Sequence, residues 1–288
     1  MHLRELVTRY AAARNAERPL GKELAPGTIR HLYESAAAYS KWLGREARIG
    51  DLIDESINHF LAHLLSIGRR PYGVKNRRTG LLVLMRFARR KGLTDAIPDG
   101  VRRVHCPELS IDGFAIDDMQ ALIEHAQTMG GTIRYTGLVR SVFWESFLRV
   151  KWELALRIGD MIRFQVADYK PGWLWVLEHK TGKQGWRELT PRTAACLERC
   201  IALKPQRELI WEGYAPQGAY KAFTRLAKRA KRPGTSKFVR RGAASELEAR
   251  TPGAAWRLLR HSVPTLFEKH YRVGRICDKN PLRPPPLG

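Results

Sequence analysis

The sequence predicts a mainly α-helical protein that has two domains and carries one small three-stranded antiparallel sheet. Its length of 288 residues is typical of two ordinary domains, and its 44% apolar content is sufficient for packed cores. Apolar residues recur at helical spacing through the first hundred residues and again after residue 191. Between residues 164 and 190, short runs rich in Trp and Val replace this pattern, which predicts strands.

Three helices are predicted in the first hundred residues. Apolar side chains form one stripe over 28–43 and another over 57–65. A third helix is predicted over 78–90, inside a stretch rich in Lys and Arg. Together these segments predict a small helical bundle with one strongly cationic side.

A linker is predicted where the helical periodicity fails. The segment IPDGVRRVHCPELSIDG contains two prolines, two glycines and a basic pair, a composition typical of chain between domains. We therefore expect a helical domain over 1–100, a linker over 101–112 and a second domain over 113–288.

The second domain is predicted to begin with helices and then form the sheet. An amphipathic helix opens at Asp117, and a long helical stretch follows that ends near Leu156. The strand-like runs FQVADY, WLWVLEHK and WRELT are separated by the turn signals Lys-Pro-Gly and Thr-Gly-Lys, which predicts a meander. Further helices are expected over 191–203, 216–231, 235–249, 252–260 and 264–271, and the proline-rich tail cannot continue a helix.

Three tryptophans, Trp173, Trp175 and Trp186, fall in the predicted strands. They could stack on nucleic-acid bases, but alternating aromatic residues in a strand usually pack against a core. We therefore expect them on the buried face of the sheet.

The charge of the chain is its strongest compositional feature. There are 51 Lys and Arg against 28 Asp and Glu, a formal net charge of +23 and a pI near 10.4. Because such an excess opposes compaction, it indicates a polyanionic partner, most commonly DNA or RNA. The stretches 69–91 and 221–241 each hold nine basic residues and no acid. The expected DNA contacts are Arg77, Arg78, Arg86, Arg89, Arg90, Lys228, Arg229, Lys231 and Arg241.

Membrane and metal classes are disfavoured by the sequence. Basic stretches also suit anionic membranes, but no run approaches the roughly 18 apolar residues that span a bilayer. The N-terminus lacks the apolar core of a signal peptide, so we expect a cytoplasmic protein associated with the nucleoid. The four cysteines, Cys106, Cys196, Cys200 and Cys277, fit no zinc spacing and are expected to be reduced thiols.

Chemistry on a nucleic-acid backbone would here depend on basic side chains and a hydroxyl. The chain contains no P-loop, no HExxH and no acidic metal cage, so we expect no cofactor and no metal. Breaking a phosphodiester without metal requires a nucleophile, cations on the two non-bridging oxygens and an acid for the departing 5′ oxygen.

Four segments supply such groups in order along the chain. They are LALRIGDMI, EHKTGKQG, SKFVRRGAAS and LLRHSVPTLFEKHY. Together they resemble the catalytic domain of the tyrosine recombinases, or phage-type integrases, over about Asp112 to Arg272. The helical first hundred residues resemble that family's core-binding domain, which clamps DNA, more loosely.

The resemblance implies two arginines that bind the phosphate. Arg157, followed by Asp160, matches the family's first catalytic arginine with its structural acid. Arg240 matches the second arginine. Guanidinium groups stay charged at any working pH and present forked donors to phosphate oxygens, so both should stabilise the charge that grows on phosphorus.

The resemblance also implies the proton-transfer groups and the nucleophile. Tyr271 matches the nucleophile, and Lys180 matches the catalytic lysine of a β-turn, from which it could protonate the leaving oxygen. Lys237 and His261 are left to handle the tyrosine proton and hold the phosphate, with the division between them open. Lys237 stands where the family usually has histidine, and Arg260 stands where a glycine commonly precedes His261.

The function implied is that of a site-specific recombinase or integrase of a mobile element, which cleaves and rejoins double-stranded DNA through a 3′-phosphotyrosyl intermediate. We expect it to act as a homo-oligomer, a tetramer, on paired DNA sites. Three alternatives are open: a catalytically silent DNA-binding relative, a nicking-closing enzyme resembling a type IB topoisomerase, and an RNA-binding protein explained by charge alone.

Overall fold

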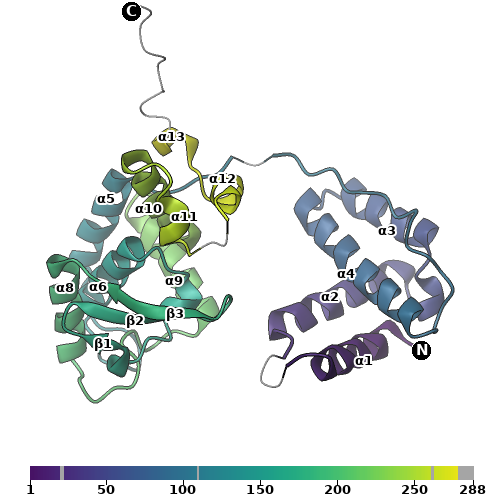
Figure 1. Cartoon of the computed structure of the whole chain (residues 1–288), viewed down its shortest axis with the longest axis horizontal. Helices are drawn as coiled ribbons and strands as arrows, with labels where there is room; N and C mark the ends of the chain where they lie inside the picture. Colours follow the sequence, from purple (N-terminus) through teal and green to yellow (C-terminus); the bar gives the residue numbers. More distant parts are fainter. Residues whose placement is uncertain (20–22, 109, 261–262, 278–288) are drawn as a thin grey trace, which may run out of the picture. The chain divides into compact units, whose positions relative to one another are not determined.

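The computed structural model describes residues 1–19, 23–108, 110–260 and 263–277 (Figure 1). The chain divides into a first unit, Met1–Leu109, and a second unit, Ser110–Gly288, which are described separately. The boundary between them falls within the segment predicted as a linker. No helix in the described ranges is both long enough and apolar enough to cross a bilayer.

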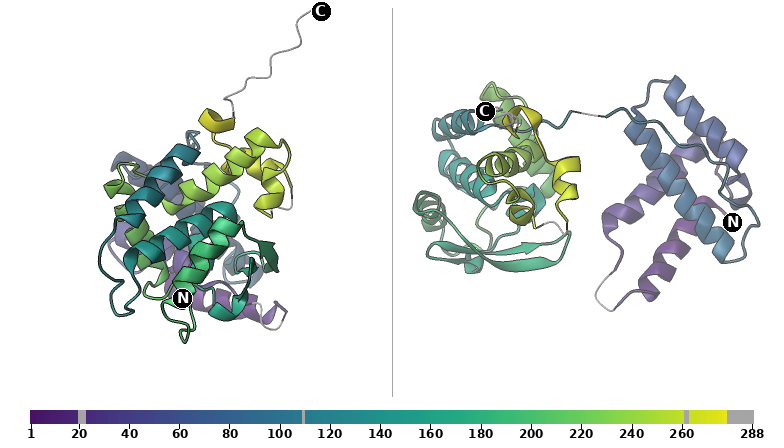
Figure 2. Two further views of the ribbon diagram at one scale, coloured as in Figure 1. Left: turned by 90° about the vertical axis from the view of Figure 1, so that its left-hand side faces the viewer. Right: turned by 45° about the horizontal axis from the view of Figure 1, so that its top comes forward.

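The first unit is a helical bundle built around its longest helix. Its elements are α1 (Leu3–Ala16), α2 (Pro26–Leu43), the short 3-10 helix η1 (Ile49–Asp51), α3 (Asp54–Ser66) and α4 (Pro71–Arg90). Helix α4 packs against each of the other three α-helices, as Figure 2 also shows. Its buried face includes Leu81, Leu84 and Met85, which join Phe60 and Tyr39 in one core.

Two helices of the first unit differ from the sequence prediction. Helix α4 begins at Pro71, seven residues earlier than expected, because proline fits the first helical turn, where its missing N–H is not needed. Helix α1 was not predicted. It buries Leu3, Leu6 and Val7 in its first half and has no large aliphatic residue afterwards, so the apolar stripe is too short to be noticed in the sequence.

The second unit joins helices to the small sheet, which Figure 1 shows on one side of the helices. Its helices are α5 (Ile116–Gln127), α6 (Arg140–Glu153), α7 (Ile158–Met161), the short 3-10 helix η2 (Val166–Asp168), α8 (Pro191–Ala202), α9 (Pro216–Arg229), α10 (Ser236–Arg250), α11 (Ala255–Leu258), α12 (Thr265–His270) and α13 (Gly274–Cys277). Helix α6 is the central one. It packs against α5, α8, α10 and α7, and its residues 143–148 are all buried.

The sheet is the predicted antiparallel meander, in the order β1 (Tyr169–Lys170), β2 (Trp173–Glu178), β3 (Lys183–Glu188). The first strand is only two residues long, because the chain just before it forms η2. The mainly α-helical fold with one three-stranded sheet is therefore confirmed.

The expectation for the tryptophans was wrong. Leu174 and Val176 are on the buried face of β2, whereas Trp173 and Trp186 are 44% and 38% exposed on the opposite face. Trp175 pairs with Trp186 across the two strands, and their rings are in edge contact at 5.4 Å. The tryptophans shield one another on the outer face and leave the core to smaller aliphatic side chains.

The chain before Tyr271 is less helical than predicted. Helix α11 covers only Ala255–Leu258, and α12 ends at His270. Between them the backbone turns at Arg260, which has a φ of 54°. A side chain in this left-handed conformation is strained unless its surroundings hold it there.

Candidate active site

A cavity of about 430 Å³ in the second unit gathers most of the residues that the resemblance implies. Its walls come from α6, the start of α7, the turn between β2 and β3, α9, α10 and the end of α12. His261 lies outside the described residues. The other five candidates all line the cavity: Arg157, Lys180, Lys237, Arg240 and Tyr271.

Arg157 is held at the N-terminal end of α7 by two buried acids. Its Nη1 donates to Oε2 of Glu178 at 2.6 Å and lies 3.9 Å from Oδ2 of Asp160. Glu178 is 2% exposed on the inner face of β2. Burial raises the pKa of Asp160, while a hydrogen bond from the backbone N–H of His179 and the charge of Arg157 oppose that rise. The acids fix the direction of the guanidinium, so Arg157 is oriented before any ligand arrives.

Arg240 is deeper and is held by backbone carbonyls. Its Nη1 donates to the carbonyl of Ala155 at 2.7 Å and its Nη2 to that of Leu259 at 3.1 Å. The guanidinium carbon lies 5.5 Å from the centre of the Tyr271 ring. Burial lowers the pKa of Arg240, and the neighbouring Tyr271 acts in the opposite direction. Arginine remains charged even so, which places a permanent cation beside the phenol.

The two candidate lysines are exposed groups at the cavity wall. Lys180 is exposed in the turn that joins β2 to β3, and Gly182, with a φ of 70°, closes that turn by donating to the Glu178 carbonyl. Lys237 is exposed in the first turn of α10, one turn before Arg240. An exposed lysine on a turn can move toward a bound phosphate without changing the fold.

Arg260 ties this hairpin to the chain before Tyr271. Its Nη2 donates to the carbonyl of Gln184 at 2.8 Å, and its own carbonyl accepts from Nζ of Lys183 at 2.6 Å. These two bonds stabilise the left-handed backbone at a position where the family commonly has glycine. An arginine is therefore compatible with the local fold at this position.

The backbone around Tyr271 is anchored to α10. Its N–H donates to the carbonyl of Phe267 at 2.8 Å, and its carbonyl accepts from the hydroxyl of Ser245 at 3.1 Å. The same Ser245 hydroxyl accepts from the N–H of Val273 at 2.9 Å. Ser245 thus fixes the chain on the C-terminal side of the candidate nucleophile.

Four further polar residues line the cavity that the sequence had not singled out: Lys151, Tyr220, Ser236 and His270. Lys151 carried a signal, because large apolar residues are spread around its helix instead of forming one stripe, which predicts burial of several of its faces together with their polar residues. Tyr220 and Ser236 carried none. Tyr220 is distant from Tyr271 in sequence, and only the packing of α9 brings it to the same cavity.

The predicted DNA-contacting residues fall into two groups. In the first unit, Arg77 is paired with Glu34 at 3.2 Å, and Arg78 donates to the carbonyls of Arg102 and Val101. In the second unit, Arg241 donates to the carbonyls of His270 and Asp112. These three are engaged within the protein. The others extend from exposed positions of the two basic helices and the turn after α9: Arg86, Arg89, Arg90, Lys228, Arg229 and Lys231.

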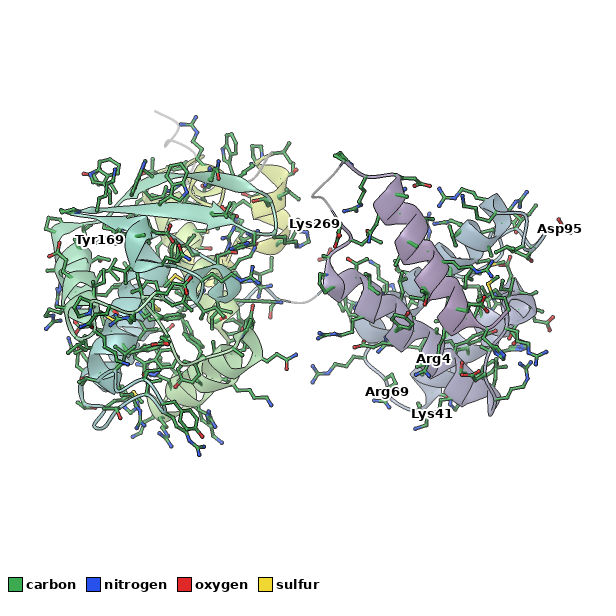
Figure 3. The ribbon with its side chains drawn as sticks, turned by 90° about the horizontal axis from the view of Figure 1, so that it is seen from below. Arg4, Lys41, Arg69, Asp95, Tyr169 and Lys269 are labelled. Carbon is green, nitrogen blue, oxygen red and sulfur yellow. The ribbon has the colours of Figure 1, made fainter. Side chains whose placement is uncertain are left out.

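Basic side chains also project from α1 and α2, at Arg4 and Lys41, and from the loop before α4, at Arg69 (Figure 3). Within the described ranges, no three His, Cys, Asp or Glu side chains are gathered as a metal site would require.

The fold that surrounds this cavity is that of the tyrosine recombinases, as solved structures with the same architecture demonstrate. Lambda integrase bound to DNA matches with a TM-score of 0.73 at 18% identity, over 98% of this chain and 100% of that one. The XerH site-specific recombinase, in a post-cleavage complex with its difH substrate, matches with a TM-score of 0.67 at 10% identity, over 91% and 89%.

The integrase of transposon Tn1549, in complex with transposon end DNA, matches with a TM-score of 0.62 at 14% identity, over 92% and 93%. No family model matches the sequence. No curated protein matches it either.

Proposed function

We propose that this protein is a DNA strand transferase of the tyrosine recombinase type, which cleaves and rejoins DNA at specific sites. The observation that carries the proposal is the convergence of Arg157, Arg240, Lys180, Lys237 and Tyr271 on one cavity from separate elements of the second unit. A phenol and several cations at one cavity are what an attack on a phosphodiester requires.

The proposed reaction begins when a DNA phosphate enters the cavity. Arg157 and Arg240 bind its non-bridging oxygens, and the phenol oxygen of Tyr271 attacks phosphorus. A phenol O–P bond forms, the bond from phosphorus to the 5′ oxygen breaks, and Lys180 gives a proton to that oxygen. Lys237 accepts the phenol proton, with His261 as the other candidate. The products are a 3′-phosphotyrosine and a free 5′ hydroxyl, so religation needs neither ATP nor metal.

Double-stranded DNA is the proposed partner, and a homo-oligomer on paired sites is the proposed assembly. The net charge of +23 supports the first. The second is supported by lambda integrase, which has been solved as a dimer on a core site and as a tetramer on a Holliday junction. Because recombination exchanges strands between two sites, a single protomer would not be sufficient.

The proposal is tested by trapping the covalent intermediate. Nicked suicide substrates tiled across the DNA that flanks the gene are incubated with the protein in the presence of a chelator and run on a denaturing gel. We expect a protein–DNA adduct that maps by peptide analysis to Tyr271. Tyr271→Phe removes only the hydroxyl and should abolish the adduct while leaving DNA affinity unchanged.

Tyr220→Phe is the matched control, because Tyr220 lines the same cavity and is 40% exposed. It should retain the adduct. If the adduct survives in Tyr271→Phe but is lost in Tyr220→Phe, the nucleophile is Tyr220 and the assignment to Tyr271 is wrong. Specific binding to the same DNA with no adduct in the unmodified protein would identify a catalytically silent DNA-binding protein instead.

A further inference from the structure

Lys151 is a buried amine on the wall of the candidate active site. It belongs to α6, lines the cavity and is only 1% exposed. Its Nζ donates to the carbonyl of Leu156, the residue before Arg157. Burying an ammonium group is costly unless an acid pairs with it. Among the ion pairs of the described residues, none involves Lys151.

The surroundings of Lys151 are cationic on two sides. Burial lowers its pKa to about 7, and the charges of Arg240 on α10 and Arg157 beside α7 lower it as well, against the attraction of Asp160. Other charged residues of α6 have partners of their own. Glu145 accepts hydrogen bonds from Gln127 of α5, from Arg149 of α6 itself and from Arg199 of α8, and Glu153 accepts from Thr190.

The buried groups around Lys151 are nearly balanced in charge when the amine is neutral, whereas the exposed Lys180 and Lys237 add positive charge to the cavity wall. Two guanidiniums, Arg157 and Arg240, face two buried acids, Asp160 and Glu178. A phosphodiester would bring one further negative charge against the two arginines, next to an amine that has, among the described residues, a single carbonyl as its hydrogen-bond acceptor. An anion close to the amine favours the charged form of the amine.

We propose that Lys151 takes up a proton when a phosphate group enters the cavity and then acts as a third buried cation beside Arg157 and Arg240. The proton comes from the solvent, is held on Nζ while the phosphate is bound and returns when the phosphate leaves. The inference rests on the proposed function only in assigning a DNA phosphate to this cavity. Because Lys151 must take up this proton, binding of the phosphate depends on pH around neutrality.

The test follows the titration of the lysine side chains in the full chain. Lysine labelled with ¹³C at Cε reports the charge of each amine by NMR. The probe is sodium sulfate, whose charge does not change near neutral pH, compared with sodium chloride at the same ionic strength. We expect one lysine resonance with a midpoint near pH 7 in chloride, and an upward shift of that midpoint by roughly one unit or more in sulfate.

Two variants assign the resonance. Lys151→Met keeps the length of the side chain and should delete the titrating signal. Lys183→Met is the matched control, because Lys183 also donates to a backbone carbonyl, that of Arg260, but does not line the cavity. It should leave the signal in place. If Lys151→Met does not fold, the spectra of the unmodified protein and of Lys183→Met still decide the question.

The inference is overturned if no lysine of the unmodified protein titrates below about pH 9, or if sulfate leaves the midpoint where chloride does. Neither outcome depends on DNA cleavage. A protein that shows the shift but forms no adduct at Tyr271 would contradict the proposed function alone. A protein that forms the adduct without a titrating lysine would contradict only the role of Lys151.

Discussion

The two candidate phosphate-binding arginines are held in different ways. The guanidinium of Arg157 is paired with the side chain of Glu178, whereas that of Arg240 is buried and bonded to the carbonyls of Ala155 and Leu259. Both are fixed before DNA binds, so little side-chain entropy should be lost when phosphate oxygens meet them. A preorganised cation stabilises a transition state more effectively than one that must first be ordered.

Arg240→Ala is expected to lower strand cleavage by about a hundredfold or more, the scale for loss of one preorganised donor to a developing negative charge. DNA affinity should change far less, since most phosphate contacts lie elsewhere. The measurement compares single-turnover adduct formation with equilibrium binding to the same substrate.

Arg241→Ala is the comparison, because Arg241 is the next residue of α10 but is partly exposed and donates to the carbonyls of His270 and Asp112. It should reduce binding slightly and leave the rate of cleavage close to normal. If Arg241→Ala loses more cleavage than Arg240→Ala, then Arg241 and not Arg240 is the arginine that stabilises the transition state. Thermal unfolding of both variants checks that the fold survives.

At the residue scale, the sequence could predict groups whose identity and order carry meaning. Arg157, Lys180, Arg240 and Tyr271 are in motifs with fixed neighbours, and the structure brings them to one cavity. Lys151 could not be assigned in this way, because its place at the cavity depends on which face of α6 meets α10. Tyr220 likewise depends on the packing of a distant helix.

At the scale of elements, α10 determines the position of half of the candidate site. It carries Lys237, Arg240 and Ser245, and it packs closely against the chain entering α5. The N–H of Phe114 donates to the carbonyl of Phe238 at 3.1 Å. A Cβ atom placed on Gly242 would lie 2.8 Å from the carbonyl carbon of Phe114 and closer still to its oxygen. Only glycine permits this approach of helix to backbone.

Gly242→Ala should therefore destabilise the second unit by about 3 kcal/mol or more, because backbone atoms cannot move aside as a flexible side chain could. Seven of the eight tryptophans belong to this unit, so tryptophan fluorescence during denaturant unfolding reports mainly on it. Gly218→Ala on α9 is the control. Its added Cβ would meet only ordinary contact, 3.7 Å from Tyr214, and alanine should stabilise the helix by about 0.5 to 1 kcal/mol. Equal stability of the two variants would contradict the close packing of α10.

The elements themselves were largely predictable, and the exceptions have physical causes. Helices with a long apolar stripe, such as α2 and α10, were predicted to within two residues at each end. Which face of the sheet is buried could not be predicted, because β2 is apolar on both sides. Trp173 and Trp175 alternate with Leu174 and Val176. Period-two alternation identifies a strand but cannot choose between two apolar faces.

At the scale of the whole molecule, the excess of positive charge should make DNA binding strongly dependent on salt. Each phosphate neutralised by a lysine or arginine contributes about 0.9 to the slope of log affinity against log salt. The exposed Arg86 and Arg89 of α4 are expected to make two of these contacts. Arg86→Gln combined with Arg89→Gln should lower the affinity and reduce the slope by about two.

The matched control neutralises Arg9 and Arg45, which are exposed but paired with Glu5 and Asp51. This variant should bind DNA with nearly the slope of the unmodified protein. Fluorescence anisotropy with a labelled duplex over a series of salt concentrations measures the affinity and the salt slope of each variant. An unchanged affinity and slope for the α4 variant would remove that helix from the DNA-binding surface.

The anchoring of Tyr271 by Ser245 has a consequence for the free energy of DNA binding. Fixing the backbone of one residue takes about 1 to 2 kcal/mol of conformational entropy at room temperature. Two hydrogen bonds of the Ser245 hydroxyl join Tyr271 and Val273 to α10, and both are present without DNA. The conformational entropy of residues 271–273 is therefore already lost when the protein folds. The binding of DNA therefore need not supply the entropy of ordering this segment, and more of the binding free energy remains for distorting the DNA itself.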